Sequence, residues 1–129
     1  MKKILLILAA STMLSGCSLA LLELIPTRWD ANQARIVTDI QQKSRHFDCK
    51  GDQLAQLGDL EKNLEWFDLY AKTKPTRDVA KLTKTMNDTL KEFKDRVQKG
   101  PVSPLYCDIK KKLFVQQADI IAGATQGRF

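Results

Sequence analysis

The stretch TRDVAKLTKTMNDTLKEFKDRVQK, residues 76–99, decides the fold class of this chain. Its apolar residues recur at steps of three and four, which is the spacing of one face of an α-helix. Asp78 near the start and Lys99 at the end suit the helix dipole, and Gly100-Pro101 ends the pattern. The stretch therefore predicts a long amphipathic helix whose buried face carries Val79, Leu82, Met86, Leu90, Phe93 and Val97.

Three further segments have helical patterns, over residues 30–47, 53–73 and 104–122. Asp30 suits the N-cap of the first segment, with Gln33 at the reciprocal position of a capping box. Ser103-Pro104 places serine at the N-cap and proline at the first helical position of the last segment. The residues that the patterns assign to these helices are Ile36, Val37, Ile40 and Phe47; Leu54, Leu57, Leu60, Leu64 and Phe67; and Leu105, Ile109, Leu113, Val115, Gln116, Ile120 and Ile121.

No run of residues alternates polar and apolar side chains for long enough to predict a strand. Gly51-Asp52, Lys74-Pro75 and Gly100-Pro101 separate the four helical segments, and Gly51 and Asp52 also suit a cap of the segment over 53–73. Short connections favour antiparallel neighbours. The sequence therefore predicts an all-α fold, a small up-and-down bundle of about four helices. The bundle domain is expected over residues 29–122, with Gly123 and Gly127 ending the last helix in a tail over 123–129.

The start of the chain carries a targeting pattern. Lys2 and Lys3 precede an apolar run that ends in Leu14-Ser15-Gly16-Cys17, and this arrangement resembles the lipobox of bacterial lipoprotein signal peptides. The resemblance covers the first 17 residues. It implies removal of residues 1–16, a diacylglyceryl group on Cys17 and an acylated α-amine, with residues 17–28 as a lipidated tether. Ser18, in place of an aspartate after the cysteine, implies the periplasmic face of the outer membrane in a Gram-negative host.

An uncleaved membrane helix is the alternative reading of this region. Glu23 is the only charged residue between Ile4 and Ile25, and such a span is long enough to cross a bilayer. The weakly apolar residues around Ser15 lie in its middle, which favours cleavage. With either anchor, the two lysines stay inside and the remaining chain lies outside the cytoplasm.

If Cys17 carries lipid, Cys49 and Cys107 remain as an even pair in an oxidising compartment. The expectation is one structural disulfide that links the end of the first helix to the start of the fourth. Two free thiols or a redox pair are the alternatives, although neither cysteine lies in a Cys-x-x-Cys motif.

Removal of the signal peptide leaves 113 of the 129 residues, which is enough for one domain with a modest core. The mature chain has 19 basic against 15 acidic residues, because Lys2 and Lys3 are lost. This mild positive charge suits anionic envelope surfaces, or it serves solubility alone. No basic stripe is interleaved with aromatic residues, so a nucleic-acid partner is not expected.

Catalytic patterns are weak throughout the chain. His46 forms His-x-Asp-Cys with Asp48 and Cys49, but a metal site needs three or four ligands and a surface histidine is favoured. Glu61 and Glu65 lie one helical turn apart, and on a polar face they are expected to be solvated rather than catalytic. Phosphate loops, nucleophile elbows and zinc motifs are missing from the sequence. The expectation is no enzyme, no cofactor and no metal.

Two groups of residues are candidates for contact with a partner or with lipid. The first is the basic run Lys110, Lys111 and Lys112, with Lys91, Lys94 and Arg96 on the preceding helix, which equally suits a solvated face. The second consists of the aromatic residues Trp29, Trp66, Phe67 and Tyr70, for which burial in the core is favoured over an exposed anchor. The terminal Arg128-Phe129 suits docking or a frayed end.

The expected function is a non-enzymatic interaction module that is held at the membrane and contacts another envelope protein. Secretin pilotins and DNA-exclusion lipoproteins are similar in plan. Trp29-Asp30 and the Tyr106-Cys107-x-Ile109-Lys110-Lys111 stretch also faintly resemble small lipoproteins of tailed bacteriophages. The alternatives are an outer-membrane spanin subunit of phage lysis, although spanins are commonly proline-rich, and an inhibitor of a periplasmic glycan hydrolase.

Overall fold

The computed structural model describes residues 30–73 and 77–126. For Arg77 and Asp78 it describes the backbone only. Within these residues the chain forms four helices and no strand: α3 (Ala31–Arg45), α4 (Gln53–Lys72), α5 (Arg77–Gln98) and α6 (Pro104–Gln126). The all-α prediction is confirmed. The helix predicted over residues 76–99 begins and ends within one residue of the observed bounds.

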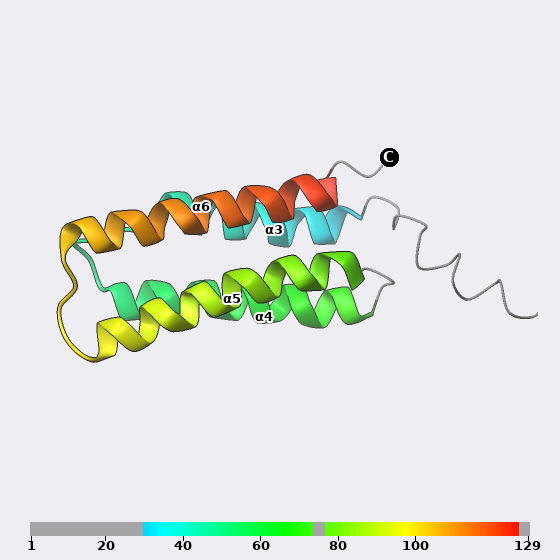
Figure 1. Cartoon of the computed structure of the whole chain (residues 1–129). Coiled ribbons are helices and arrows are strands. Elements are labelled where there is room, and N and C mark those ends of the chain that lie inside the picture. Colours follow the sequence, from blue (N-terminus) through cyan, green and yellow to red (C-terminus); the bar gives the residue numbers. More distant parts are fainter. Residues whose placement is uncertain (1–29, 74–76, 127–129) are drawn as a thin grey trace, which may run out of the picture.

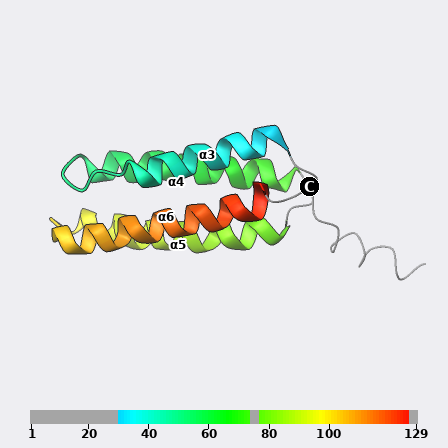
Figure 2. The ribbon, with the colours of Figure 1, turned by 90° about the horizontal axis from the view of Figure 1, so that it is seen from above.

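The four helices form an up-and-down bundle, as Figures 1 and 2 show from two directions. Each helix packs against the next one in the chain, and α6 closes the ring against α3. The start of α3, the end of α4, the start of α5 and the end of α6 lie at one end, which we call the proximal end. The α3–α4 and α5–α6 connections meet at the opposite end, which we call the disulfide end.

Side chains cap three of the helices at the predicted residues. The Asp30 carboxylate accepts hydrogen bonds from the backbone N–H groups of Asn32 and Gln33, at 2.9 and 3.2 Å. Asp52 accepts from the N–H of Ala55 at 3.0 Å, and Ser103 Oγ accepts from the N–H of Tyr106 at 3.2 Å. These bonds satisfy N–H groups that have no partner inside a helix, which explains why the helices begin at these points.

Three phenylalanine rings meet in the core near the disulfide end. Phe47, Phe93 and Phe114 come from three different elements and are at most 1% exposed. Their ring centroids lie 5.8–6.0 Å apart in tilted and edge-on arrangements, which are favourable geometries for aromatic pairs. Leucine, isoleucine, valine and methionine side chains continue the core along the bundle axis.

Helix α6 differs from the prediction in two ways. First, its core face carries Cys107, Phe114, Ala118 and Ile121, whereas Leu105, Ile109 and Ile120 of the predicted set are exposed. Second, the helix does not end at Ala122 but continues through Gly123 to Gln126. The last turn is held because Thr125 is buried and its hydroxyl donates to the Ile121 carbonyl at 2.6 Å. On α4, Leu54 was also assigned to the core, and it is 41% exposed.

Candidate partner-binding surface

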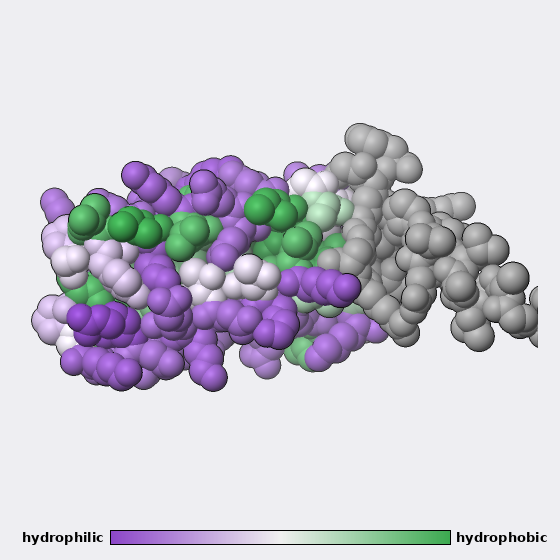
Figure 3. Space-filling view, in the orientation of Figure 1, coloured by the Kyte–Doolittle hydropathy of each residue, from purple (hydrophilic) through white to green (hydrophobic). Residues whose placement is uncertain are grey.

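The outer side of α6 carries a line of apolar side chains that face away from the core. Leu105 is 70% exposed, Ile109 48% and Ile120 56%. The half-buried Leu113 and the exposed Gln116 lie between them. Figure 3 shows hydrophobic residues in a row along α6, with hydrophilic residues between some of them. We call these five residues the outer stripe.

The spacing of the outer stripe distinguishes it from scattered surface residues. Its members follow one another at steps of four, four, three and four, so they lie on one narrow face of the helix. A stripe this narrow is typical of a seam between two helices. The neighbouring outer face of α5 instead carries charged side chains such as Lys84, Asp88 and Lys91, and it is mostly hydrophilic in Figure 3. Single exposed leucines are ordinary, whereas four apolar residues on one helix face, interrupted only by Gln116, indicate an interaction surface.

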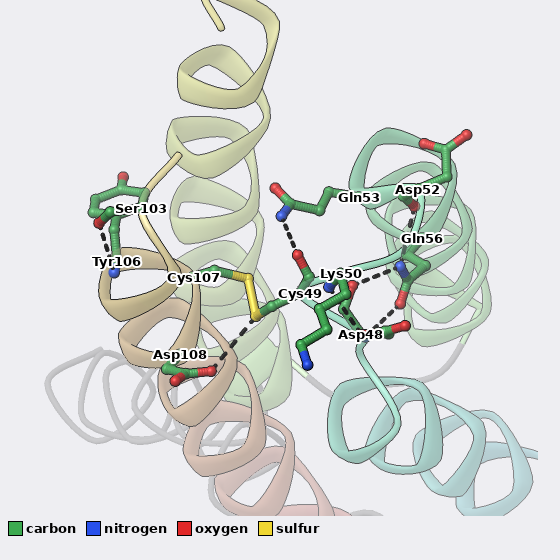
Figure 4. Close-up of a disulfide and its surroundings, with 10 residues drawn as sticks. All are labelled: Asp48, Cys49, Lys50, Asp52, Gln53, Gln56, Ser103, Tyr106, Cys107 and Asp108. Atoms are coloured by element: carbon green, nitrogen blue, oxygen red, sulfur yellow. Dashed lines mark hydrogen bonds between the residues drawn. A yellow bond between two sulfur atoms is a disulfide. The ribbon is translucent and has the colours of Figure 1, made fainter. Parts of the chain in front are cut away.

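The disulfide fixes the N-terminal half of this surface. Cys49 and Cys107 are joined with an S–S distance of 2.03 Å and a Cα–Cα distance of 5.9 Å, which confirms the predicted pairing. Figure 4 shows that the bond ties the α3–α4 connection to the first turn of α6, between Leu105 and Ile109 in sequence. Asp108 Oδ1 lies 3.7 Å from Cys49 Sγ. This is a van der Waals contact, because a disulfide sulfur carries no hydrogen to donate.

The connection that holds Cys49 is itself ordered by side chains of α4. Gln53 Nε2 donates to the Cys49 carbonyl at 2.7 Å. Gln56 accepts from the Asp48 N–H at 2.7 Å and donates to the Asp48 carbonyl at 3.0 Å, as Figure 4 shows. The start of α6 is therefore attached to a turn that is itself hydrogen-bonded, and it presents its outer residues on a rigid support.

Polar contacts hold α6 against its two neighbours farther along the helix. Asp119 accepts hydrogen bonds from Arg45 and Gln41 of α3, both at 2.6 Å. Gln117 Nε2 donates to the Thr89 hydroxyl of α5 at 2.9 Å. These contacts lie on the flanks of α6 and do not cover its outer stripe.

The three lysines of the predicted basic run on α6 differ in their exposure to solvent. Lys110 was expected to contact a partner or lipid, and the structure corrects this, because the residue is only 7% exposed. Its ammonium donates to Glu92 of α5 at 2.7 Å and lies 5.5 Å from the centroid of the Tyr106 ring. Lys111 is half-buried and Lys112 is exposed. Of the three lysines, only Lys112 is fully available at the edge of the outer stripe.

The Lys110–Glu92 pair makes a testable difference to stability. We expect Glu92→Ala to lower the free energy of unfolding by about 1–2 kcal/mol, between the values typical of exposed and buried ion pairs. The reason is that Lys110, with an 8% exposed side chain, loses its anionic partner. Urea unfolding checks this. Asp88→Ala, which breaks the exposed Lys84–Asp88 pair, is the matched control and should change stability by less than about 0.5 kcal/mol. Equal effects of the two variants would contradict the burial argument.

The aromatic residues of α4 separate into a buried and an exposed set. Phe67 is fully buried, as expected, whereas Trp66 is 43% exposed, so its favoured assignment to the core is wrong. The Arg35 guanidinium of α3 lies 5.8 Å from the centroid of the Trp66 ring. Tyr70 is half-buried, and its hydroxyl donates to the Asp30 carboxylate, with oxygen distances of 3.0 and 2.9 Å. Leu69 beside them is 55% exposed.

The candidate catalytic residues do not come together. His46 and Glu65 are exposed, and Glu61 forms an ion pair with Lys94 of α5. In the part of the chain that the structure describes, no three histidine, cysteine or acidic side chains are grouped as metal ligands. None of the helices in this part is long and apolar enough to span a bilayer.

Three predicted contact sites lie outside the described residues: the lipidation site Cys17, the aromatic Trp29 and the terminal Arg128-Phe129. Comparison of the chain with protein-family models, curated proteins and solved structures found no significant match. The function is therefore argued from the residues and from the geometry of the bundle.

The sequence reading missed the outer stripe as a site, because it assigned these residues to the core. A signal was present in helix four, which has apolar residues on two arcs rather than one. Cys107, Phe114, Ala118 and Ile121 form one arc, and Leu105, Ile109 and Ile120 form the other. A helix that is apolar on two sides has more apolar surface than one core can bury.

Proposed function

We propose that this chain is a lipid-anchored lipoprotein of the cell envelope that recognises another envelope protein through the outer stripe of α6. The observation that carries the proposal is the exposed line of Leu105, Ile109 and Ile120 on a helix that is otherwise firmly held. The lipobox sequence supports the anchor, and the mature chain is then outside the cytoplasm. An exclusion or a pilotin-like role fits this arrangement.

The size of the stripe indicates what kind of partner it suits. From Leu105 to Ile120 the stripe extends for about 22 Å, at 1.5 Å per residue of helix. Burial of a large aliphatic side chain contributes roughly 1.5–3 kcal/mol, so three partly exposed side chains give several kcal/mol before the cost of association. This favours a reversible contact with one helix of a partner over a large permanent interface.

The ordered bundle also bears on the alternatives. Pro101 and Pro104 lie at the α5–α6 connection, and the described residues form a closed helical core. This arrangement differs from the proline-rich composition that is common among outer-membrane spanins. A rigid surface that binds a partner is a better explanation of the exposed stripe than a mechanical linker.

The anchor is tested by metabolic labelling with palmitate. We expect the wild-type protein to incorporate the label and to fractionate with the outer membrane, because three acyl chains hold a protein stably at a bilayer. Cys17→Ser should lose the label and accumulate as the uncleaved precursor. A wild-type product without label would contradict the lipoprotein assignment.

The binding surface is tested by a photo-crosslinking amino acid placed at Ile120 in the native host. We expect a discrete adduct there, and none with the same amino acid at Lys91, an exposed position on the charged face of α5. Adding Ile109→Glu should reduce the Ile120 adduct at least about tenfold, because the interface would then bury an unpaired charge. Unfolding of the Ile109→Glu protein should match wild type. An adduct that persists in this variant would show that the stripe does not determine binding.

A further inference from the structure

The proximal end of the bundle fixes where the preceding chain arrives. Asp30 caps α3 and at the same time accepts the hydroxyl proton of Tyr70 near the end of α4. This contact joins residues 40 positions apart in sequence. Asp30, where the preceding chain joins α3, therefore lies beside the last turns of α4.

An apolar patch lies at that position. Trp66 and Leu69 are 43% and 55% exposed, and they precede Tyr70 on α4 by four residues and by one. We call these two residues the α4 patch. Arg35 lies over the Trp66 ring and forms no ion pair with any described residue. The patch therefore combines apolar surface with one cation at its edge.

The sequence before Asp30 contains a segment that is complementary in composition to the α4 patch. Residues 19–25 read LALLELI, with six apolar residues and one acid, Glu23. Four residues separate Ile25 from Asp30, so Ile25 can lie up to about 17 Å away when the chain is extended. Trp66 is about one helical turn, or about 6 Å, along α4 from Tyr70. The α4 patch is therefore within reach, whereas Leu54 at the disulfide end of α4 is far beyond it.

We propose that residues 19–25 pack on the α4 patch, with Glu23 facing Arg35. Packing removes leucine side chains from water and gives the segment's one acid a cationic partner. The packing itself requires no lipid. Its consequence for orientation rests on the proposed function: if Cys17 carries lipid, only Ser18 separates the anchor from the packed segment. The proximal end is then held at the membrane, and α6 extends its outer stripe away from the bilayer.

A double-mutant cycle tests the packing in the mature chain, residues 17–129 with Cys17→Ser, which has neither lipid nor partner. The segment variant changes Leu21, Leu22 and Leu24 to serine, and the patch variant is Leu69→Ser. We expect each variant to raise the unfolding equilibrium constant about tenfold. The combination should raise it about tenfold in total, well below the roughly hundredfold that additive effects would give, because residues in contact are not additive. Leu54→Ser, on the same helix and similarly exposed, is the control and should be additive with the segment variant.

A charge exchange tests independently whether Glu23 faces Arg35. Glu23→Arg and Arg35→Glu should each weaken the packing, and together they should restore it.

Fluorescence tests whether the segment covers Trp66. In a Trp29→Phe background, the fluorescence of Trp66 should shift to longer wavelength in the segment variant, because its ring becomes more exposed. Additive behaviour of Leu69→Ser, or an unchanged Trp66 spectrum, would overturn the proposal. If the segment variant instead changed only binding to phosphatidylglycerol-containing vesicles, the segment would belong to the bilayer and the proposal would be wrong.

Discussion

Removal of the Cys49–Cys107 disulfide is expected to lower the free energy of unfolding by about 4 kcal/mol. The bond links residues 58 positions apart. Its main effect is to restrict the unfolded chain, which would otherwise gain the entropy of an open loop of that length. For a single small domain, whose total stability is typically about 5–15 kcal/mol, this is a large share.

Guanidinium unfolding of the Cys49→Ala/Cys107→Ala double variant checks this value. Wild-type protein unfolded in the presence of reductant is the matched control, and it should lose nearly as much stability as the double variant. Cys107 is 1% exposed, so a small part of the loss comes from the smaller alanine side chain. A loss below about 1 kcal/mol would contradict the loop-entropy argument.

Phe93→Ala is expected to cost about 3–5 kcal/mol, which is typical when a buried phenylalanine is truncated in a core. Phe93 is fully buried, and its ring contacts Phe47, Phe114 and Tyr106 at centroid distances of 5.7–6.0 Å. The variant leaves a cavity where α5 and α6 meet the end of α3. Because the rigid surrounding helices can collapse only in part, the full cost should appear in the unfolding free energy.

Denaturant unfolding measures the Phe93→Ala loss against two controls. Phe93→Leu keeps most of the volume and should cost less than about 1.5 kcal/mol. Lys91→Ala, two residues away and exposed, should stay within about 0.5 kcal/mol of wild type. If Phe93→Ala were as mild as Lys91→Ala, the three-ring cluster would not be the centre of the core.

The helices and their starts were predictable because local chemistry determines them. Asp30, Asp52 and Ser103 cap helices at the expected positions. Such a cap is a hydrogen bond between a side-chain oxygen and a backbone N–H only two or three residues further along the chain, so the local sequence determines it. Residues 76–99 have apolar side chains on one face only, so their period predicted both the helix and its buried side. The disulfide was predictable because Cys49 and Cys107 remain as a pair if Cys17 carries lipid and the compartment is oxidising.

The candidate surface was not predictable in the same way. On α6 both the Phe114 side and the Ile109 side are apolar, and a helical period alone cannot say which one faces the core. Lys110 is buried because Glu92 of α5 lies beside it, a contact between residues 18 positions apart. The helix passes Gly123 because Thr125 is buried, although glycine in isolation favours a helix end.

Local sequence was thus sufficient to predict four helices, the caps of three of them, their antiparallel order and the pair of bonded cysteines. These features depend on neighbours in the chain and on short connections. Contacts between helices determine which apolar side of α6 is buried, that Lys110 is paired with Glu92 and that Trp66 is exposed. The physical reason is that burial depends on which other helix lies against a side chain, and that contact joins residues far apart in sequence.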